Sequence, residues 1–218
     1  MELSIPEKEL CVYVTKQLNA FFPDRILYHK ELEKSIRYAV ERLKYCFMNI
    51  EKPYYNYNGK CIFNHLHGDH YAMFLYLLSN SLYILENKDI IASKVFLLNK
   101  ALHGLDAFYS IELPEIFIFV HPVGTILGKA TYGNYFAVYQ NCTIGATEDG
   151  VYPSFSEETI CYSRSSIIGK CTVGKNVVFA ANSLIINQNI PDNRLVLGTF
   201  PNARVIENNK KVLDRLFK

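Results

Sequence analysis

Apolar residues recur every three or four positions through much of the first half of the chain, a spacing that predicts amphipathic helices. The clearest case lies in residues 30–50, where charged residues separate Leu32, Ile36, Val40, Leu43, Phe47 and Ile50. The pattern also predicts helices over 5–21, 69–84 and 88–109. Between them, residues 52–60 read KPYYNYNGK, which carries turn signals and is predicted to be a loop.

In the second half of the chain, apolar residues recur every six positions instead. The spacing is unbroken through Cys161, Ile167, Val173, Phe179 and Ile185, and it also relates Tyr132, Val138 and Ile144. A small residue or a valine lies four positions after each of the residues from Cys161 to Phe179 in this series. These residues are Ser165, Cys171, Val177 and Ser183. A period of six fits neither a helix nor a long alternating strand. It predicts a three-sided coil in which each step forms one short strand and one corner. A β-sandwich of short strands is the alternative.

The spacing of six is interrupted between Ile144 and Cys161. Residues 146–160 contain Gly150, Pro153 and four acidic residues, which predicts a loop that projects from the coil. Loops on rigid scaffolds often carry binding groups, so this segment is a candidate part of a site.

Composition narrows the class of protein. Half of the 218 residues are hydrophobic and 20% are charged, as in a globular chain. The formal charge of +2 argues against a nucleic-acid binder, and no apolar run reaches the roughly 18 residues of a membrane span. The first residues, MELSIPEKELCVYV, lack the layout of a signal peptide. Six cysteines without CxxC spacing are predicted to be reduced thiols in a cytoplasmic protein.

Charge is distributed unevenly along the chain. Residues 161–218 carry nine basic and three acidic side chains, whereas residues 111–160 carry one basic and six acidic. A basic final quarter suits a compact anionic ligand better than a long polyanion, although solvated surface lysines would give the same count.

Four segments resemble the hexapeptide-repeat acyltransferase superfamily, and serine acetyltransferases most closely. They are HPVGTILG at 121–128, VYQNCTIGA at 138–146, SSIIGKCTVG at 165–174 and VLGTFPNARVI at 196–206. The resemblance implies an α+β fold, with an N-terminal α-helical domain over 1–110 and a left-handed parallel β-helix of hexapeptide repeats over 111–206. A C-terminal tail would follow over 207–218. It also implies a homotrimer or a dimer of trimers.

The activity implied by the resemblance is acetyl-CoA-dependent O-acetylation of a small hydroxyl acceptor. His121 aligns with the family's general base, a task that suits imidazole because its ordinary pKa lies near neutrality. Glu112 is the predicted carboxylate partner of His121, with Asp106 and His103 in reserve. Val120 replaces a family aspartate, and Val151 and Tyr152 replace the family's Arg-His pair that holds the carboxylate of serine. The acceptor is therefore predicted to be serine or a sugar, with Asp69 and Tyr152 as candidate ligands.

Coenzyme A binding is also carried over by matched position. Ala146, Thr147, Ser163, Ala181 and Gly198 would line the wall along which the pantetheine arm lies. The phosphates would meet basic side chains at Lys175, Arg204, Lys210 and Lys211. No metal is expected in this mechanism.

One motif favours a different chemistry. His65, His67, Asp69 and His70 have the HxHxDH spacing of metal-dependent hydrolases, in which clustered imidazoles and a carboxylate hold metal ions. That fold needs further downstream ligands, and only two histidines, His103 and His121, follow. Asp69 could instead cap the helix that begins there. A non-catalytic β-helix scaffold is the third alternative.

Overall fold

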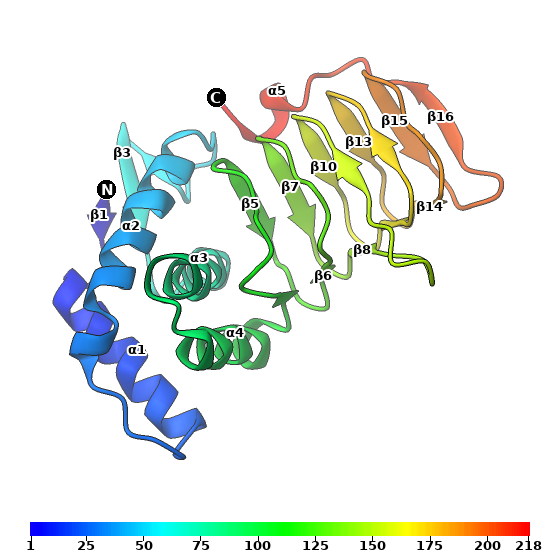
Figure 1. Cartoon of the computed structure of the whole chain (residues 1–218). Coiled ribbons are helices and arrows are strands. Elements are labelled where there is room, and N and C mark those ends of the chain that lie inside the picture. The colour runs from blue at the N-terminus through cyan, green and yellow to red at the C-terminus, as the bar shows by residue number, and fades with distance from the viewer.

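The computed structural model describes all 218 residues, which form a helical part followed by a parallel β-solenoid (Figure 1). The helical part contains α1 (Glu7–Phe21), the 3₁₀ helix η1 (His29–Glu31), α2 (Glu33–Met48), α3 (Gly68–Glu86) and α4 (Asp89–His103). The predicted helices over 5–21, 30–50 and 69–84 are confirmed. None of the helices is both long enough and apolar enough to cross a membrane.

The fourth predicted helix, over 88–109, ends earlier than expected. Gly104 follows α4 with a φ of 63°, a left-handed conformation that ends the helix and suits glycine. The chain then enters β4 (Asp106–Ala107), which pairs with β6 (Ile126–Leu127) of the solenoid. The solenoid thus begins before residue 111, the predicted domain boundary.

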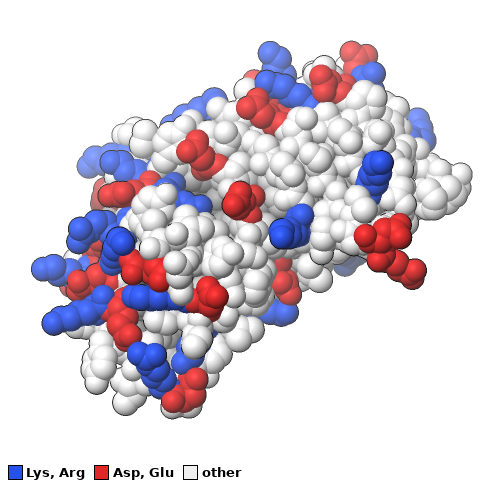
Figure 2. All heavy atoms as spheres, in the orientation of Figure 1, with Lys and Arg blue, Asp and Glu red and all other residues white.

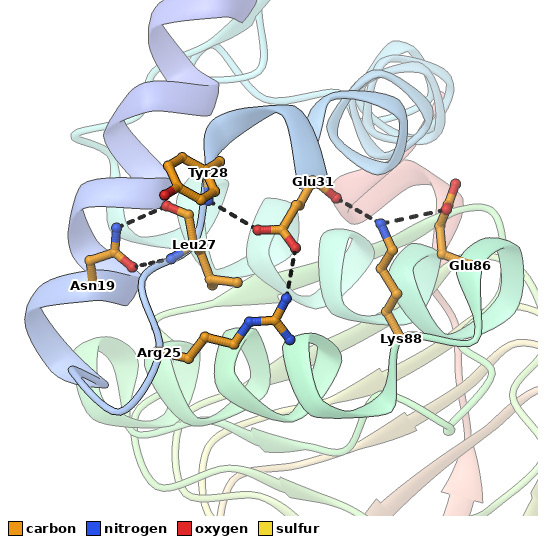
Figure 3. Close-up of polar contacts among 7 residues, drawn as sticks. All are labelled: Asn19, Arg25, Leu27, Tyr28, Glu31, Glu86 and Lys88. Carbon is orange, nitrogen blue, oxygen red and sulfur yellow. Dashed lines mark hydrogen bonds and ion pairs between the residues drawn. The ribbon is translucent and has the colours of Figure 1, made fainter.

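A polar network fixes the connection between α1 and α2 (Figure 3). The Asn19 amide donates to the Leu27 carbonyl and accepts from the Leu27 N–H. The Glu31 carboxylate accepts from the Tyr28 N–H and from Arg25, while Lys88 donates to the Glu31 carbonyl. The segment between the two helices is therefore tied to both α1 and the start of α4.

A small sheet lies at the edge of the helical part, where a loop was predicted. It contains β1 (Glu2–Leu3), β2 (Asn56–Tyr57) and β3 (Lys60–Phe63) in the order β1-β3-β2. Asn58 and Gly59 adopt positive φ and form the turn between β2 and β3. The turn signals of 52–60 were thus correct, but they mark a hairpin.

The solenoid has three sheets, one on each side of its triangular section. The first contains β5 (Phe117–Val120), β7 (Phe136–Tyr139), β10 (Thr159–Cys161), β13 (Val177–Phe179) and β15 (Arg194–Leu197), closed by the antiparallel β16 (Arg204–Glu207). The second contains β4, β6, β8 (Thr143–Gly145), β11 (Ser166–Ile168) and β14 (Leu184–Ile186). The third pairs β9 (Ser154–Phe155) with β12 (Thr172–Val173).

The six-residue spacing is confirmed as the repeat of the solenoid. Cys161, Ile167 and Val173 lie in the first, second and third sheets, and Phe179 and Ile185 return to the first and second. All five are fully buried, as are Ser165 and Ser183 at the corners. The predicted fold class, a helical domain followed by a left-handed parallel β-helix of hexapeptide repeats, is therefore confirmed.

The two parts share one continuous core. Tyr76 of α3 packs edge-on against Phe117 and Phe119 of β5, and its hydroxyl donates to the Ile111 carbonyl and accepts from the Leu113 N–H. All six cysteines are free and buried, as predicted for reduced thiols.

The C-terminal segment returns to the helical part (Figure 1). After β16 the chain forms α5 (Leu213–Leu216), and Phe217 makes an antiparallel bridge with Ile50 at the end of α2. Phe217 is buried, and the Glu51 N–H donates to the Leu216 carbonyl. The predicted tail over 207–218 is thus a structural part of the core.

Candidate active site

His121 lies at a widened corner of the first coil, between β5 and β6. The inward residues Phe119 and Leu127 on either side of it are eight positions apart, against six for Val138 and Ile144 in the next coil. The two additional residues push the corner outward, so the His121 side chain is 77% exposed. Its φ of 49° lies in the left-handed region, which other corner residues of the solenoid, such as Asn141 and Asn182, also adopt.

Asp69 is the carboxylate that faces His121. One of its oxygens accepts a hydrogen bond from the His121 N–H at 2.9 Å and lies 3.8 Å from His121 Nδ1. Asp69 sits in the first turn of α3, makes no capping bond to that helix and is almost fully buried. Burial raises its pKa above the usual value of 3.8, while the His121 N–H and ring oppose this rise. The hydrogen bond fixes the backbone of His121 beside the carboxylate, while the imidazole itself makes no hydrogen bond.

Glu112 does not pair with His121, in contrast to the sequence prediction. Its neighbours Ile111 and Leu113 turn inward and bond to the Tyr76 hydroxyl, so Glu112 between them is exposed and makes no ion pair. The two reserve residues are also engaged elsewhere. The Asp106 carboxylate accepts from Lys100 at 2.7 Å, and His103 Nδ1 lies 2.8 Å from the Asn99 amide oxygen.

The four side chains of the HxHxDH motif do not converge on one point, although two of its rings stack. His65 contacts the Ser4 hydroxyl, Asp69 faces His121, and His70 is buried among aromatic rings. His67 stacks on His70, with ring centroids 4.2 Å apart. The described residues form no group of three or more potential metal ligands. The spacing that favoured a metal-dependent hydrolase therefore does not assemble its ligand set.

His121 and Asp69 border one cleft of about 480 Å³ between the helical part and the solenoid. Its walls combine aromatic, apolar and charged side chains: Lys52, Tyr54, Tyr55, His67, Asp69, Ile118, Val120, His121, Tyr139 and Leu216. Burial raises the pKa of Tyr139 to about 12, so its hydroxyl stays protonated at neutral pH. The cleft is large enough for a small polar acceptor.

Sequence reasoning missed most of this cleft. Lys52, Tyr54 and Tyr55 come from the predicted loop, His67 was noted only as a metal ligand, and Leu216 comes from the predicted tail. Of the ten lining residues, only His121 and Tyr139 lie inside the four segments that carry the resemblance. The composition of 52–60, rich in tyrosine, was the one available signal that this loop borders a binding surface.

Three of the predicted coenzyme A residues lie directly along the corner that carries His121. The register aligns Phe119, Val138, Cys161, Phe179 and Val196 in successive strands of the first sheet. The residues two positions later therefore stack in the order His121, Gln140, Ser163, Ala181 and Gly198. With strands spaced about 4.8 Å apart, this ledge runs for about 19 Å from the imidazole. A Cβ on Gly198 would meet nothing within 4 Å, so this end is open.

Ala146 and Thr147 lie at the next corner, beyond the second sheet. They directly follow β8, whereas Ser163, Ala181 and Gly198 lie at the corner before the second sheet. The predicted coenzyme A residues therefore lie at two different corners, with the second sheet between them. Tyr152 is not brought to the cleft. Its ring lies so close to Gly128 that a Cβ on that glycine would be 2.5 Å from it, which indicates that the loop folds back onto the solenoid.

The basic residues predicted for the phosphates are dispersed. Lys175 pairs with Glu158 at 3.1 Å and with Glu157 at 3.3 Å, which neutralises its charge. Arg204 is exposed on β16, and Lys210 and Lys211 are exposed before α5. In the view of Figure 2, charged side chains crowd over the helical part and the visible flank of the solenoid is mostly uncharged.

Two solved serine acetyltransferases share the fold of this chain, a helical domain followed by a hexapeptide β-helix. The enzyme from Neisseria gonorrhoeae in complex with serine is 16% identical, with a TM-score of 0.71 over 93% of this chain and 84% of that one. The enzyme from Brucella abortus in complex with coenzyme A is 16% identical, with a TM-score of 0.71 over 95% of this chain and 84% of that one.

The curated relatives carry the same name. A serine acetyltransferase from Bacillus pumilus is 26% identical over 113 residues, which cover 50% of this chain and 51% of the relative. The chain thus spans about half the length of this relative. No family model matches the chain. The resemblance to serine acetyltransferase-like hexapeptide acyltransferases, inferred from four short segments, is confirmed by both comparisons.

Proposed function

We propose that this protein is an acetyl-CoA-dependent O-acetyltransferase whose acceptor is serine. The observation that carries the proposal is the exposed His121, held against the buried Asp69 at the foot of the ledge formed by Ser163, Ala181 and Gly198. The imidazole of His121 thus provides a base at one end of the site, and the ledge provides an open surface for the extended coenzyme A molecule. The names of the similar proteins, and the serine and coenzyme A in two of the similar structures, support this assignment.

The chemistry follows from the geometry of His121. Its Nε2 takes the proton of the acceptor hydroxyl as the oxygen attacks the thioester carbonyl. The carbon–sulfur bond then breaks, the acetyl group remains on the acceptor oxygen, and the thiolate of coenzyme A leaves with the proton. The negative charge of Asp69 stabilises the imidazolium that forms between these events. The ledge would hold acetyl-CoA, which supplies the activated acyl group.

The cleft favours serine over a neutral sugar as the acceptor. Tyr152, the residue that suggested a polyol, lies against Gly128 and outside the cleft. The cleft instead contains Asp69 and Lys52, which carry opposite charges and make no ion pair with each other. Two opposite charges that line one cleft suit a zwitterion, and Asp69 can meet its ammonium group as well as the His121 imidazole.

A thiol-release assay with acetyl-CoA tests the function. The purified chain is offered serine, homoserine, and free and nucleotide-linked sugars, and the product is identified by mass spectrometry. We expect O-acetylserine as the main product. Acetylation of a sugar alone would replace serine as the acceptor, and no transfer to any hydroxyl would refute the activity.

Replacing Asp69 with Asn should lower kcat/KM for serine about 10- to 100-fold. The amide oxygen can still accept the His121 N–H, so the corner keeps its shape, but the negative charge beside the imidazole is lost. Glu112→Gln is the matched control, because Glu112 is exposed and pairs with no cation. A loss confined to Glu112→Gln would restore the original sequence prediction of the partner.

The proposal also includes the oligomeric assembly and the cellular location of the protein. The flank of the solenoid that Figure 2 shows carries few charged side chains, which supports packing of copies into the predicted homotrimer or dimer of trimers. The six unpaired cysteines support the predicted cytoplasmic location.

A further inference from the structure

Lys52 is the only lysine or arginine that borders the cleft. Its side chain is half-buried, and its ammonium makes no hydrogen bond or ion pair, in contrast to Lys175, which is held by two glutamates. A half-buried ammonium without a partner remains available to an anionic ligand. The other charged group at the cleft is Asp69, of opposite sign.

The backbone around Lys52 is fixed from both sides. The Lys52 carbonyl accepts from the N–H groups of Tyr55 and Asn56, which closes a tight turn. The Asn56 amide then donates to the carbonyls of Phe47 and Ile50, both at 2.7 Å, and so ties this turn to the end of α2. The next anchor is the bond from the Glu51 N–H to Leu216, at 2.8 Å. The backbone that carries Lys52 is therefore already ordered before a ligand binds, and only the side chain has to be immobilised.

The loop after β8 offers no alternative cation. Residues 146–153 contain neither lysine nor arginine, and Glu148 and Asp149 are exposed there. A negatively charged loop repels a carboxylate. Any positive charge for the acceptor must therefore come from another part of the molecule.

We propose that Lys52 binds the carboxylate of the acceptor and so makes the enzyme selective for a free amino acid. The inference rests on the proposed function. Serine at neutral pH carries three groups that need partners: the hydroxyl meets His121, the ammonium meets Asp69, and the carboxylate meets Lys52. The site thus takes its cation from the turn that follows α2.

The test compares L-serine with L-serinamide, which keeps the amine and hydroxyl but has no carboxylate. Full-length wild type, Lys52→Met and Lys52→Arg are assayed with acetyl-CoA. Lys52→Met should raise KM for serine about 10- to 100-fold, with kcat and the KM for acetyl-CoA nearly unchanged. Its kcat/KM for serinamide should stay within about twofold of wild type. Lys52→Arg should restore most of the preference for serine.

Lys60→Met is the matched control, because Lys60 is exposed and borders a different hollow. It should retain the wild-type ratio of kcat/KM for serine to that for serinamide. Equal losses for both acceptors in Lys52→Met, or no loss for either, would overturn the role of Lys52 while leaving the acetyltransferase intact. A wild type that acetylates neither acceptor would overturn the proposed function and this inference with it.

Discussion

Replacement of His121 by Asn should lower kcat for acetyl transfer about 100- to 10,000-fold, the usual contribution of a positioned general base. Asparagine tolerates the left-handed conformation at this position, and its N–H can still donate to Asp69. The exposed side chain contributes no core packing, so the free energy of unfolding should change by no more than about 0.5 kcal/mol. Steady-state thiol release and urea unfolding measure the two effects separately.

Coenzyme A binding provides the control for this variant. The ledge beyond His121 consists of Gln140, Ser163, Ala181 and Gly198, none of which is altered, so the Kd for coenzyme A should match that of wild type. Loss of both turnover and coenzyme A binding would indicate a disturbed corner instead of a missing base. Turnover close to that of wild type would show that another group removes the proton.

The solenoid could be predicted well because its six-residue spacing relates residues that are close together in the sequence. Each inward position, such as Ile167 or Phe179, is defined by its distance from the one before, and every copy of the repeat adds weight to the same assignment. The end of α4 was misjudged because Leu105 and Phe108 continue the helical spacing of apolar residues past Gly104. There, the left-handed glycine outweighed the periodicity.

The candidate site was harder to predict because its parts meet across the fold. His121 was found from its immediate neighbours, which resemble a known segment. Its partner Asp69 lies 52 positions away in the chain, and the two meet only because α3 packs against β5. Lys52 reaches the cleft through a turn anchored to the C-terminal segment. No spacing rule relates such residues, so the sequence could nominate candidates but could not pair them.

Acidification should destabilise the protein through His70. The ring is buried beside Phe47, Tyr55 and Phe63, and burial, with a further contribution from His67, lowers its pKa from 6.5 to about 3. Its Nδ1 accepts the Asn64 N–H, and its Nε2 is buried without a partner, so the fold holds the neutral form. Below pH 6.5 the unfolded chain gains a proton at this residue that the folded chain does not bind. Stability therefore falls as pH falls, by about 3 kcal/mol between pH 6.5 and 4.

Urea unfolding at a series of pH values measures this loss, with His70→Phe as the decisive variant. Phenylalanine keeps an aromatic ring in the cluster but cannot be protonated, so the decline in stability between pH 6.5 and 4 should be smaller by about 3 kcal/mol. At neutral pH the variant should be about 1 kcal/mol less stable, because the Asn64 N–H loses its acceptor. If His70→Phe kept the wild-type decline in stability between pH 6.5 and 4, the acid sensitivity would arise elsewhere. The half-buried His103, whose pKa burial also lowers, would then be the next residue to replace.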